Sequence, residues 1–376
     1  MFLSGLGTSA AVPQLVLFLV QDLHTPLPVA GLFYLTSLAG PVAGYLVGSY
    51  SDRTGGRLGL FRLCAVVGFV GWAGIALSTA AWMPFVINAI FLAFSASTAS
   101  QLFAAIHDSL SRNPERANES VVAIIRMALT AGWVVGPVLG AWLAAETGLR
   151  VMLWGTAICF LAQIVPLGRL SVSAPLATEA SAGAPRTSRG RNIWPLLAFT
   201  GLFVLVYAGE ATKYGYLPVY MDEQLKLAPA VRGAVIGIQP LIELMLMPLS
   251  VPLGRRVGML WLMCIAAGLC VAANLCFAMW ASVTGMFAGQ ILMGGVWGVF
   301  MVLGIIAAQR LLPGSVATAS AIFLNSSPFG IAFGGVVGSI GIATVGLPNV
   351  YFLPAGCALI AVFGLAAMAR SGIVRD

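Results

Sequence analysis

The sequence consists of long apolar stretches that follow one another with only short polar gaps between them. A helix needs about 20 apolar residues to cross the hydrocarbon core of a bilayer, and only helices and closed barrels satisfy their backbone polar groups there. Hydrophobic residues make up 60% of the 376 residues and charged residues 8%, which excludes a water-soluble domain of this length. The sequence therefore predicts an all-α integral membrane protein.

The apolar stretches number twelve, and the basic residues between them set an expected orientation. Fourteen Lys and Arg residues fall in the even-numbered gaps and the C-terminal tail, whereas three fall in the odd-numbered gaps. Cytoplasmic loops carry the excess of Lys and Arg in membrane proteins. We therefore expect both termini in the cytoplasm, and we read the net charge of +7 as a sign of topology, not of a nucleic-acid partner.

A polar, Ser/Ala/Pro/Gly-rich segment at 169–192 interrupts the apolar pattern. It predicts a cytoplasmic linker between six-helix bundles at 1–168 and 193–376. An offset of 198 residues supports the repeat, because it aligns three glycines of the first half with three of the second: Gly132, Gly136 and Gly140 with Gly330, Gly334 and Gly338. Glycine at every fourth residue lets neighbouring helices approach closely, either as static packing or as a sliding contact. The same spacing occurs at Gly40, Gly44 and Gly48.

Two motifs resemble those of the major facilitator superfamily. Between the second and third stretches, the chain has a glycine, an aspartate-arginine pair and a glycine-arginine end: Gly48, Asp52, Arg53, Gly56 and Arg57. The fifth stretch is similar to the antiporter motif of that superfamily: Gly132, Gly136, Pro137 and Gly140. The resemblance implies twelve helices in two pseudo-symmetric bundles and a cytoplasmic gating motif at the first of these sites. Simple loop anchoring is the alternative for the gating motif.

A narrower resemblance is to the bacterial sugar efflux transporters. The segments that carry it are Gly31 to Tyr34, Gln101 to Ala104, Arg126 before Trp133 to Pro137, and Glu243 before Gly254 to Gly258. The resemblance implies a multi-pass protein of the bacterial inner membrane that exports sugars or small glycosides in exchange for protons by alternating access. Its partners would be a small solute, protons and the lipid bilayer. The seventh stretch departs from the neutral family pattern at Glu210 and Lys213, so a drug or metabolite:proton antiporter is the alternative.

Four charged residues lie deep inside apolar stretches, where a charge is costly and marks a functional candidate: Arg126, Glu210, Lys213 and Glu243. Protonation would remove the cost of a carboxylate at Glu243, so we expect this residue to carry a proton. Competition between solute and Arg126 for Glu243 would couple the two fluxes, whereas simple charge pairing within the bundle is the structural alternative. Glu210 and Lys213 are three residues apart on one helix face, which predicts either a neutralising pair or a site for a polar solute.

Polar and aromatic residues within the apolar stretches are candidates for solute contacts. Amide hydrogen bonds beside flat apolar surfaces suit sugars, although each such residue could equally join helices. The candidates are Gln14, Gln101, Trp133, Tyr207, Tyr214, Gln239, Gln290 and Asn325, and Trp297 offers a further aromatic surface.

The sequence offers no metal, cofactor or nucleotide motif. The six cysteines are scattered without metal-binding spacing, and no phosphate-binding loop is present. An integral membrane enzyme would need clustered catalytic residues, which the scattered acids Asp22, Asp108, Glu115 and Glu119 do not provide. We therefore expect a non-enzymatic protein, and we keep a membrane enzyme only as a remote alternative.

Overall fold

The structure, a computed structural model, describes residues 1–112, 120–167 and 193–372. Side chains are described in these ranges except at residues 107–112, 120–124, 126, 167 and 317. The predicted linker at 169–192 and the side chain of Arg126 lie outside the described residues.

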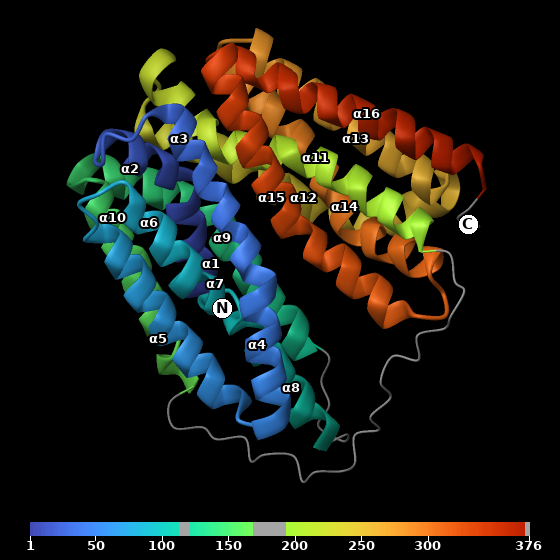
Figure 1. Ribbon diagram of the computed structural model, residues 1–376, viewed down its shortest axis with the longest axis horizontal. Coiled ribbons are helices and arrows are strands. Elements are labelled where there is room, and N and C mark those ends of the chain that lie inside the picture. The colour runs from blue at the N-terminus through green and yellow to red at the C-terminus, as the bar shows by residue number, and fades with distance from the viewer. Residues whose placement is uncertain (113–119, 168–192, 373–376) are drawn as a thin grey trace. The chain divides into compact units, whose positions relative to one another are not determined.

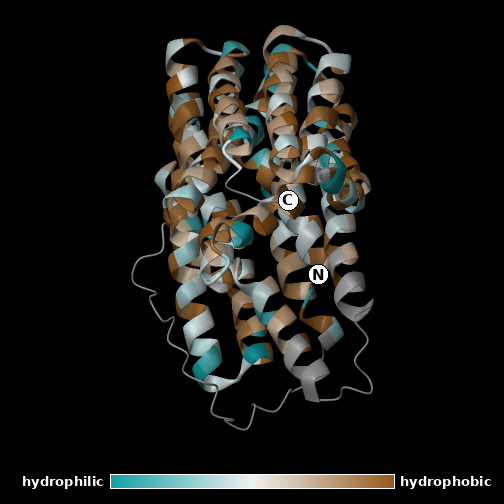
Figure 2. Cartoon of the chain, turned by 90° about the vertical axis from the view of Figure 1, so that its right-hand side faces the viewer, coloured by the Kyte–Doolittle hydropathy of each residue, from teal (hydrophilic) through white to brown (hydrophobic). Residues whose placement is uncertain are grey.

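The described residues form helices and turns, with no β-strand among them. Eleven helical segments of this part of the chain are long and apolar enough to span a membrane, and the shorter apolar helix Leu149–Ala162 falls at the remaining predicted stretch. Figure 2 shows most helical surfaces in the apolar colours. The prediction of an all-α membrane protein is confirmed.

The described residues group into two compact units: residues 1–24, 36–112 and 120–167 form the first, and residues 25–35 and 193–372 form the second. The helices of the first unit are α1 (Phe2–Ala11), α2 (Leu15–Gln21), α4 (Ala39–Thr54), α5 (Arg57–Ala76), α6 (Trp82–Ile87), α7 (Ala93–Ser95), α8 (Thr98–Arg112), α9 (Ser120–Thr147) and α10 (Leu149–Ala162). Those of the second unit are α3 (Leu27–Gly31), α11 (Trp194–Val219), α12 (Pro229–Val257), α13 (Met259–Met279), α14 (Val283–Leu311), α15 (Val316–Thr344) and α16 (Phe352–Arg370) (Figure 1).

Short irregular helical segments join several of these helices. A 3₁₀ turn at Val12–Gln14 links α1 to α2, and a longer one at Leu32–Leu38 links α3 to α4. Single π-helical turns lie at Asn88–Leu92 and Tyr220–Gln224, and 3₁₀ turns at Val165–Leu167 and Asn349–Tyr351. Side chains and water can satisfy the backbone groups freed at such breaks.

Glycines of α9 allow a close contact between α1 and α9 in the first unit. A Cβ atom added at Gly132 would lie 2.6 Å from the Leu6 nitrogen, and one at Gly140 would lie 2.7 Å from the Ala10 Cα. The Ser9 hydroxyl uses this proximity to donate a 3.0 Å hydrogen bond to the Gly132 carbonyl. Residues larger than glycine would push α1 away.

The second unit repeats this contact between α11 and α15. A Cβ atom at Gly330 would lie 2.5 Å from the Tyr207 Cβ, and one at Gly334 would lie 2.6 Å from the Ala208 carbonyl oxygen. Here the Thr212 hydroxyl donates a 3.1 Å hydrogen bond to the Gly334 carbonyl. The glycines that the 198-residue offset matched thus make equivalent contacts in the two units.

The third glycine series makes no such contact among the described residues of the first unit. Cβ atoms built at Gly40, Gly44 and Gly48 of α4 would meet no described atom within 4 Å. The stripe is therefore open within this unit, and close helix packing at these glycines stays a prediction. Glycine spacing predicts a helix face without side chains, but it does not predict which helix packs against that face.

The short helix α3 belongs to the second unit, although it precedes most of the first unit in the sequence. It packs against α15 and α11. The Ser339 hydroxyl of α15 donates a 2.6 Å hydrogen bond to the Pro28 carbonyl, and Gly31 faces the Tyr216 hydroxyl so closely that a side chain there would collide. Residues 25–35 are thus an integral part of the second unit.

Candidate functional site

A buried ion pair lies in the middle of α11. Lys213 Nζ is 2.9 Å from Glu210 Oε1, and their side chains are only 1% and 8% exposed. The three-residue spacing places both on one face of the helix. A pair removed this far from water is stable only when further hydrogen bonds satisfy its remaining atoms.

Gln239 of α12 supplies two of these hydrogen bonds. Its Nε2 donates to Glu210 Oε1 over 2.9 Å, and its Oε1 accepts from Lys213 Nζ. One amide therefore complements both charges, because it presents a donor to the carboxylate and an acceptor to the ammonium.

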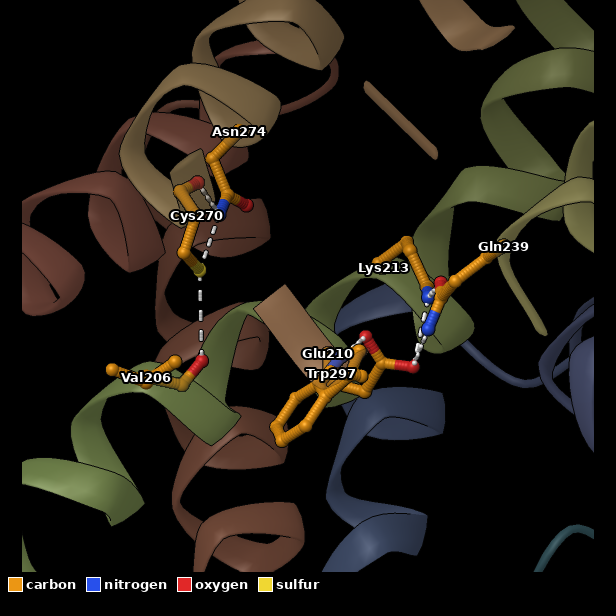
Figure 3. Close-up of polar contacts among 7 residues, drawn as sticks. All are labelled: Val206, Glu210, Lys213, Gln239, Cys270, Asn274 and Trp297. Atoms are coloured by element: carbon orange, nitrogen blue, oxygen red, sulfur yellow. Dashed lines mark hydrogen bonds and ion pairs between the residues drawn. The ribbon is translucent and has the colours of Figure 1, made fainter. Parts of the chain in front are cut away.

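Trp297 of α14 completes the group by donating from its indole Nε1 to Glu210 Oε2 over 2.6 Å. Figure 3 shows the side chains from α11, α12 and α14 converging on the Glu210 carboxylate. We call Glu210, Lys213, Gln239 and Trp297 the Glu210 cluster. Both carboxylate oxygens have donors in it, so the charges balance and their hydrogen bonds hold the three helices together.

Aromatic rings border the Glu210 cluster. The Tyr207 and Trp297 rings lie 4.8 Å apart between centroids, and Lys213 Nζ lies 4.1 Å from the centroid of Tyr214. Phe203 packs edge-on against Trp297. Flat apolar faces beside amide and charged groups are suited to bind polar rings such as those of sugars.

Glu243 lies one helical turn beyond Gln239 on α12 and is half-buried. It interacts electrostatically with both Glu210 and Lys213. No hydrogen bond or ion pair joins it to another side chain in the part of the chain that the structure describes. Glu243 is thus a carboxylate beside the Glu210 cluster that takes part in none of the hydrogen bonds of the cluster.

A second group of polar contacts joins α13 to α11, and the sequence analysis did not predict it. Asn274 of α13 donates over 2.8 Å to the Cys270 carbonyl, and the Cys270 thiol donates to the Val206 carbonyl at 3.8 Å (Figure 3). Gly209 makes room for it, because a Cβ atom there would lie 2.8 Å from the Asn274 amide nitrogen. The sequence feature that could have indicated these contacts is Asn274, an isolated asparagine within an apolar stretch.

Two predicted solute residues of the second unit lie apart from the Glu210 cluster. Gln290 of α14 is fully buried, and neither of its amide atoms has a partner among the described residues. Asn325 of α15 is exposed and lines a cavity of about 570 Å³ between α11 and α15, together with Thr200 and Ser326.

The predicted solute residues of the first unit are dispersed. Gln14 is buried at the break between α1 and α2, and Trp133 is half-buried on α9. Gln101 of α8 accepts a 2.6 Å hydrogen bond from Ser51 of α4, so the structure places it beside the predicted gating motif. Sequence spacing could not reveal this contact between distant helices.

Residues of the predicted gating motif form a small network at the end of α4. Gly55 ends that helix with φ of 65°, a left-handed conformation that glycine adopts without strain. Arg57 then pairs with Asp52 at 3.2 Å and donates to the Ser51 hydroxyl at 3.4 Å, whereas Arg53 is exposed. The turn between α4 and α5 is thereby tied to α8 through Gln101.

A buried, hydrogen-bonded charge cluster within bundled membrane-spanning helices is typical of a membrane transporter. Solved structures that share this fold include transporters: the crystal structure of the nucleoside transporter NupG has a TM-score of 0.78 at 19% identity and covers 98% of this chain and 96% of its own. The matched proteins are transporters, not enzymes.

The chain belongs to the Major Facilitator Superfamily, whose sequence profile matches residues 1–220. Sugar efflux transporter A of Dickeya chrysanthemi is 26% identical over 340 residues, which cover 90% of this chain and 86% of that protein. Sugar efflux transporter C of Escherichia coli (strain K12) is 25% identical over 348 residues, with the same coverage. The protein is therefore a multi-pass transporter of the bacterial cell membrane.

Proposed function

We propose that this protein is a secondary active exporter of sugars or small glycosides, which it exchanges for protons by alternating access. The observation that carries the proposal is the Glu210 cluster with its aromatic border, because it combines amide, charged and flat apolar groups within the bundle. The names of the two sugar efflux relatives support the substrate class.

The chemistry of the cluster fits a neutral, polyhydroxylated solute. Lys213 and Glu210 neutralise one another, so an uncharged solute leaves no net charge buried. Hydroxyl groups of a sugar can both donate to Glu210 and accept from Lys213 or Gln239, replacing the contacts that these residues make with each other. Tyr207 and Trp297 would stack on the apolar faces of the ring.

Glu243 is the proposed proton carrier. Its half-buried position leaves it reachable by protons, and its electrostatic interaction with Glu210 and Lys213 makes the charge of the cluster depend on its protonation. A coupling role for Arg126 is part of the same proposal. In the same scheme the Asp52–Arg57 pair acts as the gate that forms in one conformation and breaks in another.

A drug or metabolite:proton antiporter is the second candidate function. It is favoured by the buried charges Glu210 and Lys213, either of which could pair with an ionised solute. A cationic solute would compete with Lys213 for the carboxylate of Glu210.

Transport into inside-out proteoliposomes under an imposed proton gradient tests these proposals. We expect gradient-driven accumulation of labelled lactose or glucose by the wild type, and its loss in Glu243→Gln with solute exchange retained. Glu223→Gln is the matched control, because Glu223 is an exposed acid of the same unit. Accumulation of a cationic dye without either sugar would favour the second function, and gradient-driven transport by Glu243→Gln at the wild-type rate would exclude Glu243 as the proton carrier.

A further inference from the structure

A separate cavity of about 290 Å³ lies in the second unit, where α12 ends, α13 begins and α14 ends. Its lining combines two arginines with a glycine and four apolar side chains: Val251, Gly254, Arg255, Met259, Leu303, Ile306 and Arg310. None of these residues belongs to the Glu210 cluster. Neither the proposed solute path nor the gating motif uses this cavity.

The two charged residues of this cavity come from different helices and have the same sign. Arg255 lies in the last turn of α12 and Arg310 in the last turn of α14, and both are exposed at its rim. Two guanidinium groups at one cavity provide planar hydrogen-bond donors that match phosphate oxygens.

None of the described acids of the second unit, which are Glu210, Asp222, Glu223 and Glu243, lines this cavity. Asp222 and Glu223 precede the opposite end of α12, where Asp222 pairs with Arg232 at 2.5 Å. Glu243 is twelve residues before Arg255, which corresponds to about 18 Å along a helix. Two arginines and no described acidic residue line the cavity, which gives it an electrostatic preference for an anion.

The remaining walls distinguish a lipid from a soluble anion. Val251, Met259, Leu303 and Ile306 give the cavity an apolar interior next to its basic rim, at the ends of two predicted membrane spans. A free phosphate would leave these walls uncovered, whereas a phospholipid can place its phosphate on the arginines and its glycerol and first methylenes on the walls. Basic pockets between helix ends at the membrane surface bind acidic lipid headgroups in this way.

We propose that this cavity binds the phosphate headgroup of one anionic phospholipid. Arg255 and Arg310 hold the phosphate, and the apolar walls hold the start of the acyl chains. The bound lipid bridges the ends of α12 and α14 at the first turn of α13. This site is independent of the solute that the protein carries.

Native mass spectrometry of the full chain tests the site directly, with phosphatidylglycerol or phosphatidylcholine added to delipidated protein. An arginine near an anionic headgroup contributes a factor of about five in affinity, so we expect Arg255→Gln with Arg310→Gln to weaken the tightest phosphatidylglycerol site about 25-fold. Arg256→Gln is the matched control, because Arg256 is an exposed neighbour of Arg255 that does not line the cavity. The affinity of the Arg256→Gln variant for phosphatidylglycerol should stay within about twofold of that of the wild type.

Three results would overturn the proposal. Equal phosphatidylglycerol affinity of the wild type and the double variant would show that Arg255 and Arg310 do not bind the phosphate. An equal loss in Arg256→Gln would show general attraction to positive charge instead of a site. Stabilisation of the wild type by inorganic phosphate, with none added by short-chain phosphatidylglycerol, would assign the cavity to a free anion. Thermal unfolding of each variant without added lipid checks that the variants fold.

Discussion

The indole Nε1 of Trp297 donates a 2.6 Å hydrogen bond to Oε2 of Glu210, across 87 residues of sequence. The other carboxylate oxygen of Glu210 faces Lys213 and Gln239. Trp297 thereby fixes the orientation of the carboxylate and offers its ring beside Tyr207.

Trp297→Phe should keep the ring and remove the hydrogen bond. A hydrogen bond to a charged group contributes about 1.5–3 kcal/mol, so we expect the apparent solute affinity to fall by roughly tenfold to 100-fold if the orientation of Glu210 matters for binding. The dependence of the transport rate on solute concentration in proteoliposomes measures this apparent affinity. Trp261→Phe, at a partly exposed position on α13, is the control. Unchanged affinity in Trp297→Phe would mean that the solute does not depend on this bond.

Lys213→Met should be strongly destabilising, because it leaves the Glu210 carboxylate buried without its countercharge. Breaking a buried ion pair from one side costs about 3–5 kcal/mol. Adding Glu210→Gln should restore most of the lost stability, since no uncompensated charge remains. Unfolding of the two single variants and the double variant in one detergent gives the coupling energy. Additive effects of the two substitutions would contradict the pairing.

Gly136→Ala should destabilise the first unit, because the added methyl group would lie 2.6 Å from the Leu6 carbonyl oxygen and even closer to the Ser9 hydroxyl. Overpacking of this kind costs about 1–3 kcal/mol. Gly44→Ala is the matched control, as it adds the same group into open space on α4. Thermal unfolding compares them, and equal midpoints would show that α1 and α9 can separate without cost.

Asp52→Asn should alter transport far more than stability. The Asp52 side chain is 71% exposed, and exposed ion pairs contribute at most about 1 kcal/mol to folding. If the pair with Arg57 holds one conformation, its loss should lower the transport rate while the unfolding midpoint stays near that of the wild type. Asp22→Asn, which removes the 3.1 Å pair with Arg150, tests whether any lost ion pair has this effect. Wild-type transport in Asp52→Asn would rule out the gate.

Hydropathy made the fold predictable, because a helix in lipid must be long and apolar whatever its neighbours are. Local spacing also predicted that Glu210 and Lys213 share a helix face, and they form an ion pair. These inferences required only the geometry of a single helix.

Contacts between helices could not be predicted in this way. The roles of Gln239 and Trp297 depend on how α12 and α14 cross α11, which one sequence does not encode in any local pattern. The same limit explains Gln101, a predicted solute residue that contacts Ser51 of α4. Which face of a helix meets which neighbour is a property of the assembled bundle.

The membership of residues 25–35 in the second unit has a consequence for biosynthesis. These residues leave the ribosome well before α11 and α15, against which α3 packs, have been made. The first half of the chain must therefore insert before α3 can pack against α11 and α15. For the same reason, a chimera that joins halves of two related transporters must keep α3 matched to the α15 of its partner half, particularly at Pro28 and Ser339.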